Sequence, residues 1–188
     1  MDKIVLDIET KNSFADVGGR DNFDALQVSL VGLYSYDRDE YFALEEHELD
    51  KLEDILSHAG LVIGFALKRF DFPVLKKHVP FDIFKLKYLD ILEEIEMRLG
   101  RRIGLDALAQ ANLGFGKNGD GLEAIRLYKE GKIDELKKYC LQDVKVTKEV
   151  YDYAMKKREL VVPSWRTPFP DKITIDWVDE VLPQATLF

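Results

Sequence analysis

The sequence predicts an α/β protein in which helices flank a mixed β-sheet. Three apolar, alternating segments come first, at residues 3–9, 28–36 and 40–44, and helices mixed with further strands follow them. Strands followed by a mixture of helices and strands are typical of a layered α/β architecture. The chain has 188 residues, enough for one domain with a substantial core.

The pattern of apolar side chains predicts each element. Ile4, Leu6 and Ile8 alternate along the first strand, and the short connection 37–39 predicts a hairpin between the second and third strands. The apolar run 61–66 predicts a buried strand, and residues 172–175 a short late one. Asp71 is expected to cap a helix that has Pro73 in its first turn. Helical spacing predicts further helices at 46–58, 88–99, 104–112, 119–130 and 133–158.

Composition limits the class of protein. Charged residues make up 33% of the chain and apolar residues 46%, as in globular proteins. Cys140 is the single cysteine, so an internal disulfide and a cysteine zinc cluster are excluded. A reducing, cytoplasmic setting is expected. The N-terminus carries acids where a signal peptide would be apolar, and no apolar run approaches the ~20 residues of a membrane span.

The charge is unevenly distributed. The net charge is −8, which at first argues against nucleic acid. Residues 37–54 hold nine acidic and two basic residues, whereas residues 60–104 hold nine basic and six acidic ones. A phosphate backbone responds to the local field, so the overall sign does not exclude a nucleic-acid partner.

Three segments carry carboxylates in suggestive places. Asp7 and Glu9 lie two apart at the carboxyl end of the first strand, so both point to one face, at the edge where α/β sheets bind ligands. Asp71 follows the apolar strand 61–66. Asp143 interrupts a stripe of apolar or small residues on the long helix, and Tyr139 lies one turn earlier on the same side. A buried charge there needs a partner or a metal.

Four carboxylates brought together would repel one another and raise one another's pKa values. Divalent cations remove that repulsion, and an all-oxygen set of ligands suits Mg²⁺ or Mn²⁺. Two such ions about 4 Å apart can activate water and stabilise the leaving oxygen of a phosphodiester. The carboxylates therefore predict two divalent cations and phosphoryl chemistry.

Three motifs in this order carry a resemblance to a known family: LDIET with Asp7 and Glu9, GFALKRFDFPVL with Asp71, and YCLQDV with Tyr139 and Asp143. Over about residues 3–155 the sequence resembles the DEDD superfamily of 3′-to-5′ exonucleases, which have a ribonuclease H-like fold. It is closest to the tyrosine-bearing branch, which includes the proofreading domains of family B DNA polymerases and stand-alone prokaryotic relatives. A histidine branch would need histidine at position 138, which is Lys138.

The resemblance implies an exonuclease domain at residues 1–160, followed by a C-terminal extension at 161–188. It implies that Asp7, Glu9, Asp71 and Asp143 bind the two metals, that Tyr139 orients the attacking water, and that Thr10 and Phe70 lie beside the terminal nucleotide. Relatives often carry Asn five positions before the middle Asp, where this chain has Ala66. This difference concerns a substrate or supporting contact rather than the metal ligands.

The expected substrate is the 3′ end of single-stranded or frayed nucleic acid, with DNA favoured over RNA and DNA repair among the open roles. Arg101, Arg102 and Lys117 are expected to hold the backbone, on account of the basic bias of residues 60–104 and the glycine-rich stretch 114–121. Two alternatives remain. One is a haloacid dehalogenase-like phosphatase, because LDIET also resembles the D-x-D-x-T nucleophile motif of those enzymes, with Glu9 in place of the second Asp. The other is a non-catalytic nucleic-acid or clamp-binding module on the same fold.

The C-terminus, LPQATLF, is a candidate partner-binding peptide. Gln184, Leu187 and Phe188 form a Q-x-x-L-F pattern that resembles the peptide with which proteins dock on the bacterial sliding clamp. Two large apolar side chains are costly to leave in water, at ~1.5–3 kcal/mol each for full burial. We expect them to insert into a partner's pocket, the alternative being that they fold back onto their own domain.

Overall fold

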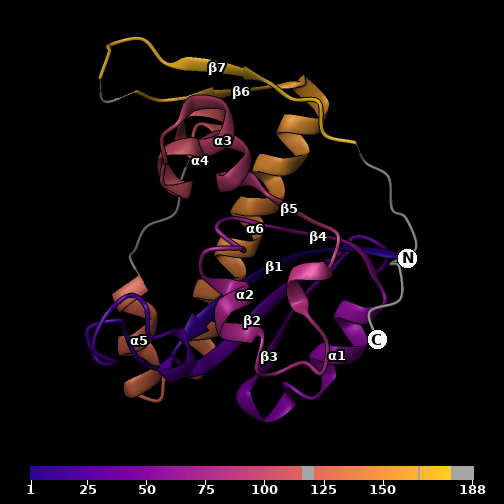
Figure 1. Cartoon of the computed structure of the whole chain (residues 1–188), viewed down its shortest axis with the longest axis vertical. Coiled ribbons are helices and arrows are strands. Elements are labelled where there is room, and N and C mark those ends of the chain that lie inside the picture. Colours follow the sequence, from indigo (N-terminus) through magenta and orange to yellow (C-terminus); the bar gives the residue numbers. More distant parts are fainter. Residues whose placement is uncertain (116–120, 165, 179–188) are drawn as a thin grey trace.

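A mixed five-stranded β-sheet forms the centre of the computed structural model, which describes residues 1–115, 121–164 and 166–178 (Figure 1). The strands of this sheet are β1 (Asp2–Thr10), β2 (Val28–Ser35), β3 (Glu40–Glu45), β4 (Ala59–Gly64) and β5 (Tyr88–Asp90). A second, two-stranded sheet consists of β6 (Glu159–Val162) and β7 (Asp171–Thr174). The helices are α1 (Lys51–Ser57), α2 (Asp71–Leu75), α3 (Ile91–Leu99), α4 (Leu105–Leu113), α5 (Gly121–Lys129) and α6 (Ile133–Lys157). Single 3₁₀ turns lie at Phe23–Ala25, Glu46–Glu48 and Ile83–Lys85.

The strand order is β3-β2-β1-β4-β5, so β1 lies in the middle. β1 pairs antiparallel with β2, and β2 pairs antiparallel with β3, which confirms the predicted hairpin. β1 and β4 are parallel, as are β4 and β5. β4 pairs with only the first half of β1, because its last partner there is Val5. The second half of β1 therefore extends beyond β4, and this uncovered edge is where the candidate site forms.

Alternate residues of β1 belong to different cores. Ile4, Leu6 and Ile8 pack with buried residues of α1 and α2 on one face of the sheet. Val5 faces the other way and packs with α3, α4 and α6. The period of two in a strand places Asp7 and Glu9 on the same face as Val5. Both carboxylates therefore point toward the helix α6.

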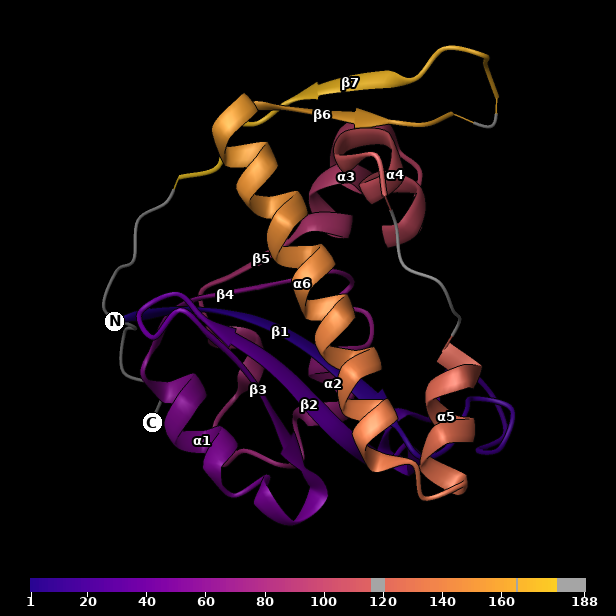
Figure 2. The same ribbon diagram turned by 180° about the vertical axis from the view of Figure 1, so that it is seen from behind.

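Helix α6 has 25 residues, spans about 37 Å and crosses this second face of the sheet (Figure 2). Its buried stripe includes Val144, Val150 and Ala154, with Asp143 on the same side. The β6–β7 hairpin covers its C-terminal end together with α3 and α4, and Leu160, Val162, Ile173 and Trp177 enter their core. No helix in the described parts of the chain has the length and apolar character needed to cross a membrane.

Three expectations for individual elements are wrong, and one strand was not expected. The helix predicted at 46–58 divides into a 3₁₀ turn and α1. The helix predicted at 88–99 begins at Ile91, because Tyr88–Asp90 pairs with β4 as the edge strand β5. β6 was not expected, since no breaker separates it from α6; Arg158 ends the helix in a left-handed conformation with φ 57°. Asp71 is the first residue of α2 rather than its cap, and the N-cap position is Phe70.

Candidate active site

Asp7 and Glu9 lie at the end of β1, on the face that α6 covers. Glu9 is 8% exposed and Asp7 is half-buried. One oxygen of each carboxylate and the sulfur of Cys140 all lie within 4.8 Å of one another. The Cys140 thiol approaches Oδ2 of Asp7 at 3.8 Å. Two carboxylates and a thiol thus converge between the strand and the helix.

Asp71 joins this group from the segment that follows β4. Its Oδ1 accepts a hydrogen bond from the backbone N–H of Ile8 at 3.1 Å. Because β4 no longer pairs with β1 at that position, the carboxylate takes the place of a strand partner, which is why it does not cap its own helix. Burial raises the pKa of Asp71 well above its ordinary value, and the negative charge of Asp7 raises it further.

The helix α6 supplies Asp143 and Tyr139. Asp143 is 5% exposed. Burial raises the pKa of the Cys140 thiol, and the charges of Asp7, Glu9 and Asp143 add to the effect. Cys140 therefore lies among the carboxylates of both the strand and the helix. Tyr139 is half-buried and packs against the small core of Leu30, Ala124, Leu127, Leu136 and Cys140.

Cys140 is the residue at this site that sequence reasoning did not single out. It occupies the same helical stripe as Asp143, three positions earlier, and this spacing was the available signal. Gly32 of β2 leaves room for it: a Cβ at position 32 would come within 2.6 Å of the sulfur. The strand and the helix therefore approach closely at this point because position 32 has no side chain.

The donor set fits divalent cations. Asp7 and Glu9 lie within 4.8 Å of each other, the charge of Asp7 raises the pKa of Asp71, and the charge of Asp143 raises the pKa of the Cys140 thiol beside them. A divalent cation would relieve that repulsion, and carboxylate oxygens are the ligands that Mg²⁺ and Mn²⁺ prefer. Asp7 is closest to the middle of the group, since Glu9, Cys140 and Asp71 all interact with it.

A pocket of about 250 Å³ opens beside Glu9. Thr10 and Phe70, both predicted to contact the substrate, line this pocket. The other lining residues are Glu9, Asn12, Ser13, Phe14, Leu26, Leu122 and Ile125. The Phe14 ring meets the Phe70 ring edge to face, with centroids 5.9 Å apart. The pocket thus combines aromatic walls with the carboxylate of Glu9 at its margin.

Arg101 and Arg102, two of the three residues predicted to bind the nucleic-acid backbone, do not line this pocket. Arg101 has a side chain only 10% exposed; it forms an ion pair with Asp171 at 2.6 Å and donates to the carbonyl of Val162. Arg102 is exposed and pairs with Glu96 at 3.1 Å. Lys117, like the tail residues Gln184, Leu187 and Phe188, lies outside the described residues.

Comparisons with known proteins agree with the fold described above. A model of the RNase H superfamily matches residues 4–155. Two solved structures share the fold: the family B DNA polymerase from the hyperthermophilic archaeon Pyrobaculum calidifontis, with 16% identity and a TM-score of 0.63, and the RNase D of Trypanosoma brucei, with 17% identity and a TM-score of 0.58. The match to the polymerase covers 82% of this chain and 24% of the polymerase chain. The match to the RNase D covers 80% of this chain and 56% of the RNase D chain. No curated protein matches it in sequence.

Proposed function

The chain belongs to the RNase H superfamily, and from this premise we propose that it is a divalent-metal-dependent exonuclease that removes nucleotides from a 3′ end. The observation that carries the proposal is the pair of carboxylates Asp7 and Glu9 on β1, with Asp71 of α2 and Asp143 of α6 near enough for their charges to act on the same group of side chains. Glu9 also lines the pocket. A phosphatase of the haloacid dehalogenase type is no longer an alternative, because the fold is ribonuclease H-like.

The carboxylates would hold two divalent cations. Bound cations would supply an activated water and would stabilise the leaving oxygen of the phosphodiester. Asp7, at the middle of the group, is the candidate for a ligand shared by both ions. Glu9 and Asp143 would complete the set from the strand and the helix, and Asp71 from the start of α2.

Tyr139 would orient the attacking water. It precedes Asp143 by one helical turn, so the two side chains are neighbours on α6. A tyrosine has an ordinary pKa of about 10 and is a weak base at neutral pH. A role in holding the water is therefore the chemically simpler one, with the metals lowering the pKa of that water.

The pocket would receive the terminal nucleotide. Its volume of about 250 Å³ is just below the range for small-molecule sites, ≈ 300–1,000 Å³, which suits one terminal nucleotide rather than a continuous strand. Phe70 and Phe14 offer ring faces and edges against which a base can stack, and such stacking is largely independent of sequence. DNA is favoured over RNA as the substrate, and DNA repair is one process in which such an activity would serve.

The test is a digestion series with 5′-labelled single-stranded DNA, duplex DNA and RNA, each with Mn²⁺, Mg²⁺ or EDTA. We expect a ladder that shortens from the 3′ end in the presence of either metal and no digestion with EDTA. Asp143→Asn should abolish the ladder. Asp37→Asn, which removes the same charge from the exposed turn after β2, is the matched control and should digest normally. Internal cuts, or digestion of a circular single strand, would contradict an exonuclease.

A further inference from the structure

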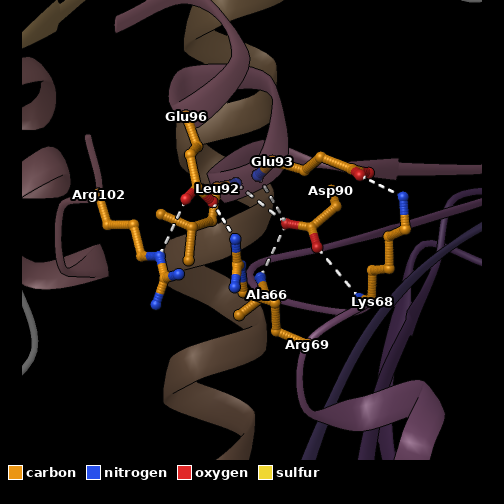
Figure 3. A network of polar contacts seen from close by, with 8 residues as sticks. All are labelled: Ala66, Lys68, Arg69, Asp90, Leu92, Glu93, Glu96 and Arg102. Carbon is orange, nitrogen blue, oxygen red and sulfur yellow. Dashed lines mark hydrogen bonds and ion pairs between the residues drawn. The ribbon is translucent and has the colours of Figure 1, made fainter. Parts of the chain in front are cut away.

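The carboxylate of Asp90 joins two segments that are distant in the sequence. It is 2% exposed and lies at the N-terminus of α3. Its Oδ1 accepts hydrogen bonds from the backbone N–H groups of Leu92 at 3.0 Å and Glu93 at 3.3 Å, which cap the helix. The same carboxylate accepts from Ala66 at 2.8 Å through Oδ1 and from Lys68 at 3.1 Å through Oδ2 (Figure 3).

The second segment, residues 65–70, leads directly into the candidate site. It runs from the end of β4 to Phe70, which lines the pocket, and to Asp71. Ala66 adopts a left-handed conformation with φ 73°, which is strained for an L-residue because its Cβ lies too close to the following carbonyl oxygen. Its carbonyl accepts from the N–H groups of Arg69 and Phe70 and closes the turn. A strained turn needs other contacts to stabilise it. The Asp90 carboxylate provides one, because it accepts a hydrogen bond from the N–H of Ala66, the strained residue.

The ion pairs around Asp90 are weaker candidates for that task. Lys68 pairs with Glu93, and Arg69 and Arg102 both pair with Glu96 (Figure 3). The three cationic side chains are about half exposed, and exposed ion pairs contribute little to stability. Backbone hydrogen bonds to a buried carboxylate hold the turn more strongly. Burial keeps water away from the carboxylate, so breaking these hydrogen bonds would leave its charge without a partner.

We propose that Asp90 is a positioning residue for Asp71 and Phe70: its carboxylate fixes the turn at Ala66–Lys68 and so sets where the following carboxylate and ring lie. This inference rests on the proposed nuclease function, because it concerns one of the four proposed metal ligands. Asp90 touches neither the pocket nor the hydrogen bond between Asp71 and Ile8. The negative charge of Asp90 also raises the pKa of Asp71, whereas its hydrogen bonds to the turn reach Asp71 only through the backbone of residues 66–70.

Two variants separate this role from simple capping of α3. Asn and Ser are as good as Asp at a helix N-cap. Asp90→Asn keeps an oxygen for Ala66 and α3 but turns an amide NH₂ toward the N–H of Lys68. Asp90→Ser can still cap α3, but its shorter side chain reaches neither Ala66 nor Lys68. Both variants remove the same charge, so a difference between them is not an effect of charge.

The direct readout is hydrogen exchange at the amide of Ile8, which Asp71 protects. We expect exchange there to be fastest in Asp90→Ser, intermediate in Asp90→Asn and slowest in the native protein, with about a tenfold span, and Leu33 of β2 serves as the reference for opening of the whole sheet. Ile95→Val in the buried side of α3 is the control for lost stability, and Glu93→Gln the control for a lost ion pair. Neither control should change the exchange of Ile8 relative to Leu33.

Metal affinity and kinetics complete the test. In Asp90→Ser we expect Mn²⁺ to bind more weakly by calorimetry and kcat to fall by about tenfold to a hundredfold, as small misplacements do. The proposal is overturned if the exchange of Ile8 in Asp90→Ser equals that in Ile95→Val. If the native protein neither binds Mn²⁺ nor digests nucleic acid, the nuclease proposal fails, and the exchange of Ile8 still decides whether Asp90 positions Asp71.

Discussion

Replacement of Asp7 by Asn should stabilise the protein in a chelator and destabilise it, relative to the native chain, in manganese. Asp7 lies within 4.8 Å of the Glu9 carboxylate and raises the pKa of Asp71. Two unit charges at that separation repel by about 3.5 kcal/mol at an effective dielectric constant of about 20, and by about 0.9 kcal/mol in bulk water. Allowing about 1 kcal/mol for lost hydrogen bonding, the net gain should be up to about 2.5 kcal/mol.

The assay is thermal unfolding with EDTA and with Mn²⁺. For a chain of this size 1 kcal/mol shifts the Tm by about 2–4 °C, so Asp7→Asn should unfold up to about 10 °C above the native protein in EDTA. Mn²⁺ at 100 times its Kd should add about 2.7 kcal/mol to the native protein and little to the variant. The order of the two Tm values should therefore reverse.

The control is Asp37→Asn, at an exposed turn residue, which should stay within about 0.5 kcal/mol of the native protein in both conditions. This prediction is wrong if Asp7→Asn is less stable than the native protein in EDTA and gains as much stability as the native protein from Mn²⁺. That result would mean that the carboxylates are held apart by other contacts and do not share a cation.

Further predictions concern single residues of the site and its surroundings. Tyr139→Phe should lower kcat while Mn²⁺ affinity by calorimetry stays nearly constant; an unchanged kcat would leave the ring only a packing role. In EDTA, the stability that Asp71 contributes is present in full below its ordinary pKa and is lost as the pH rises through its raised folded pKa. Urea unfolding should therefore show that the native protein becomes more stable relative to Asp71→Asn as the pH is lowered toward the ordinary Asp pKa of 3.8, and a difference that does not change with pH would contradict this. Ala66→Gly should raise the free energy of unfolding by about 1 kcal/mol, because glycine adopts φ 73° without strain; a loss of stability would argue against the turn described above. Removal of residues 184–188 should abolish binding to a bacterial sliding clamp in a calorimetric titration, and equal binding with and without them would end that hypothesis.

Local periodicity was sufficient to predict the carboxylates of β1 and α6. The period of two placed Asp7 and Glu9 on one face, and the break in an apolar stripe indicated a buried Asp143; the structure places them accordingly. Thr10 and Phe70 came from the resemblance alone, because nothing in their local pattern indicates a shared pocket. The structure brings both to its walls.

Features that depend on strand ends could not be predicted locally. Asp71 was expected to cap a helix, since no sequence pattern shows that β4 stops short of Ile8 and leaves its N–H to be satisfied. Asp90 lay within a predicted helix for a similar reason: three residues of edge strand before α3 carry too little periodicity to distinguish them from a first helical turn. The position of a strand end is set by tertiary contacts, so the contacts made there follow from the fold.

The contact between Cys140 and Asp7 joins residues 133 positions apart. Contacts of such long range are slow to form, because the intervening chain must first be ordered. During synthesis the strand β1 emerges first, and α6 can pack on it only after more than a hundred further residues have been added. Until then Asp7 and Glu9 have no Asp143 opposite them. On the proposed function, a chain in which α6 has not yet been made would lack a complete metal centre, because Asp143 and Tyr139 are both on that helix.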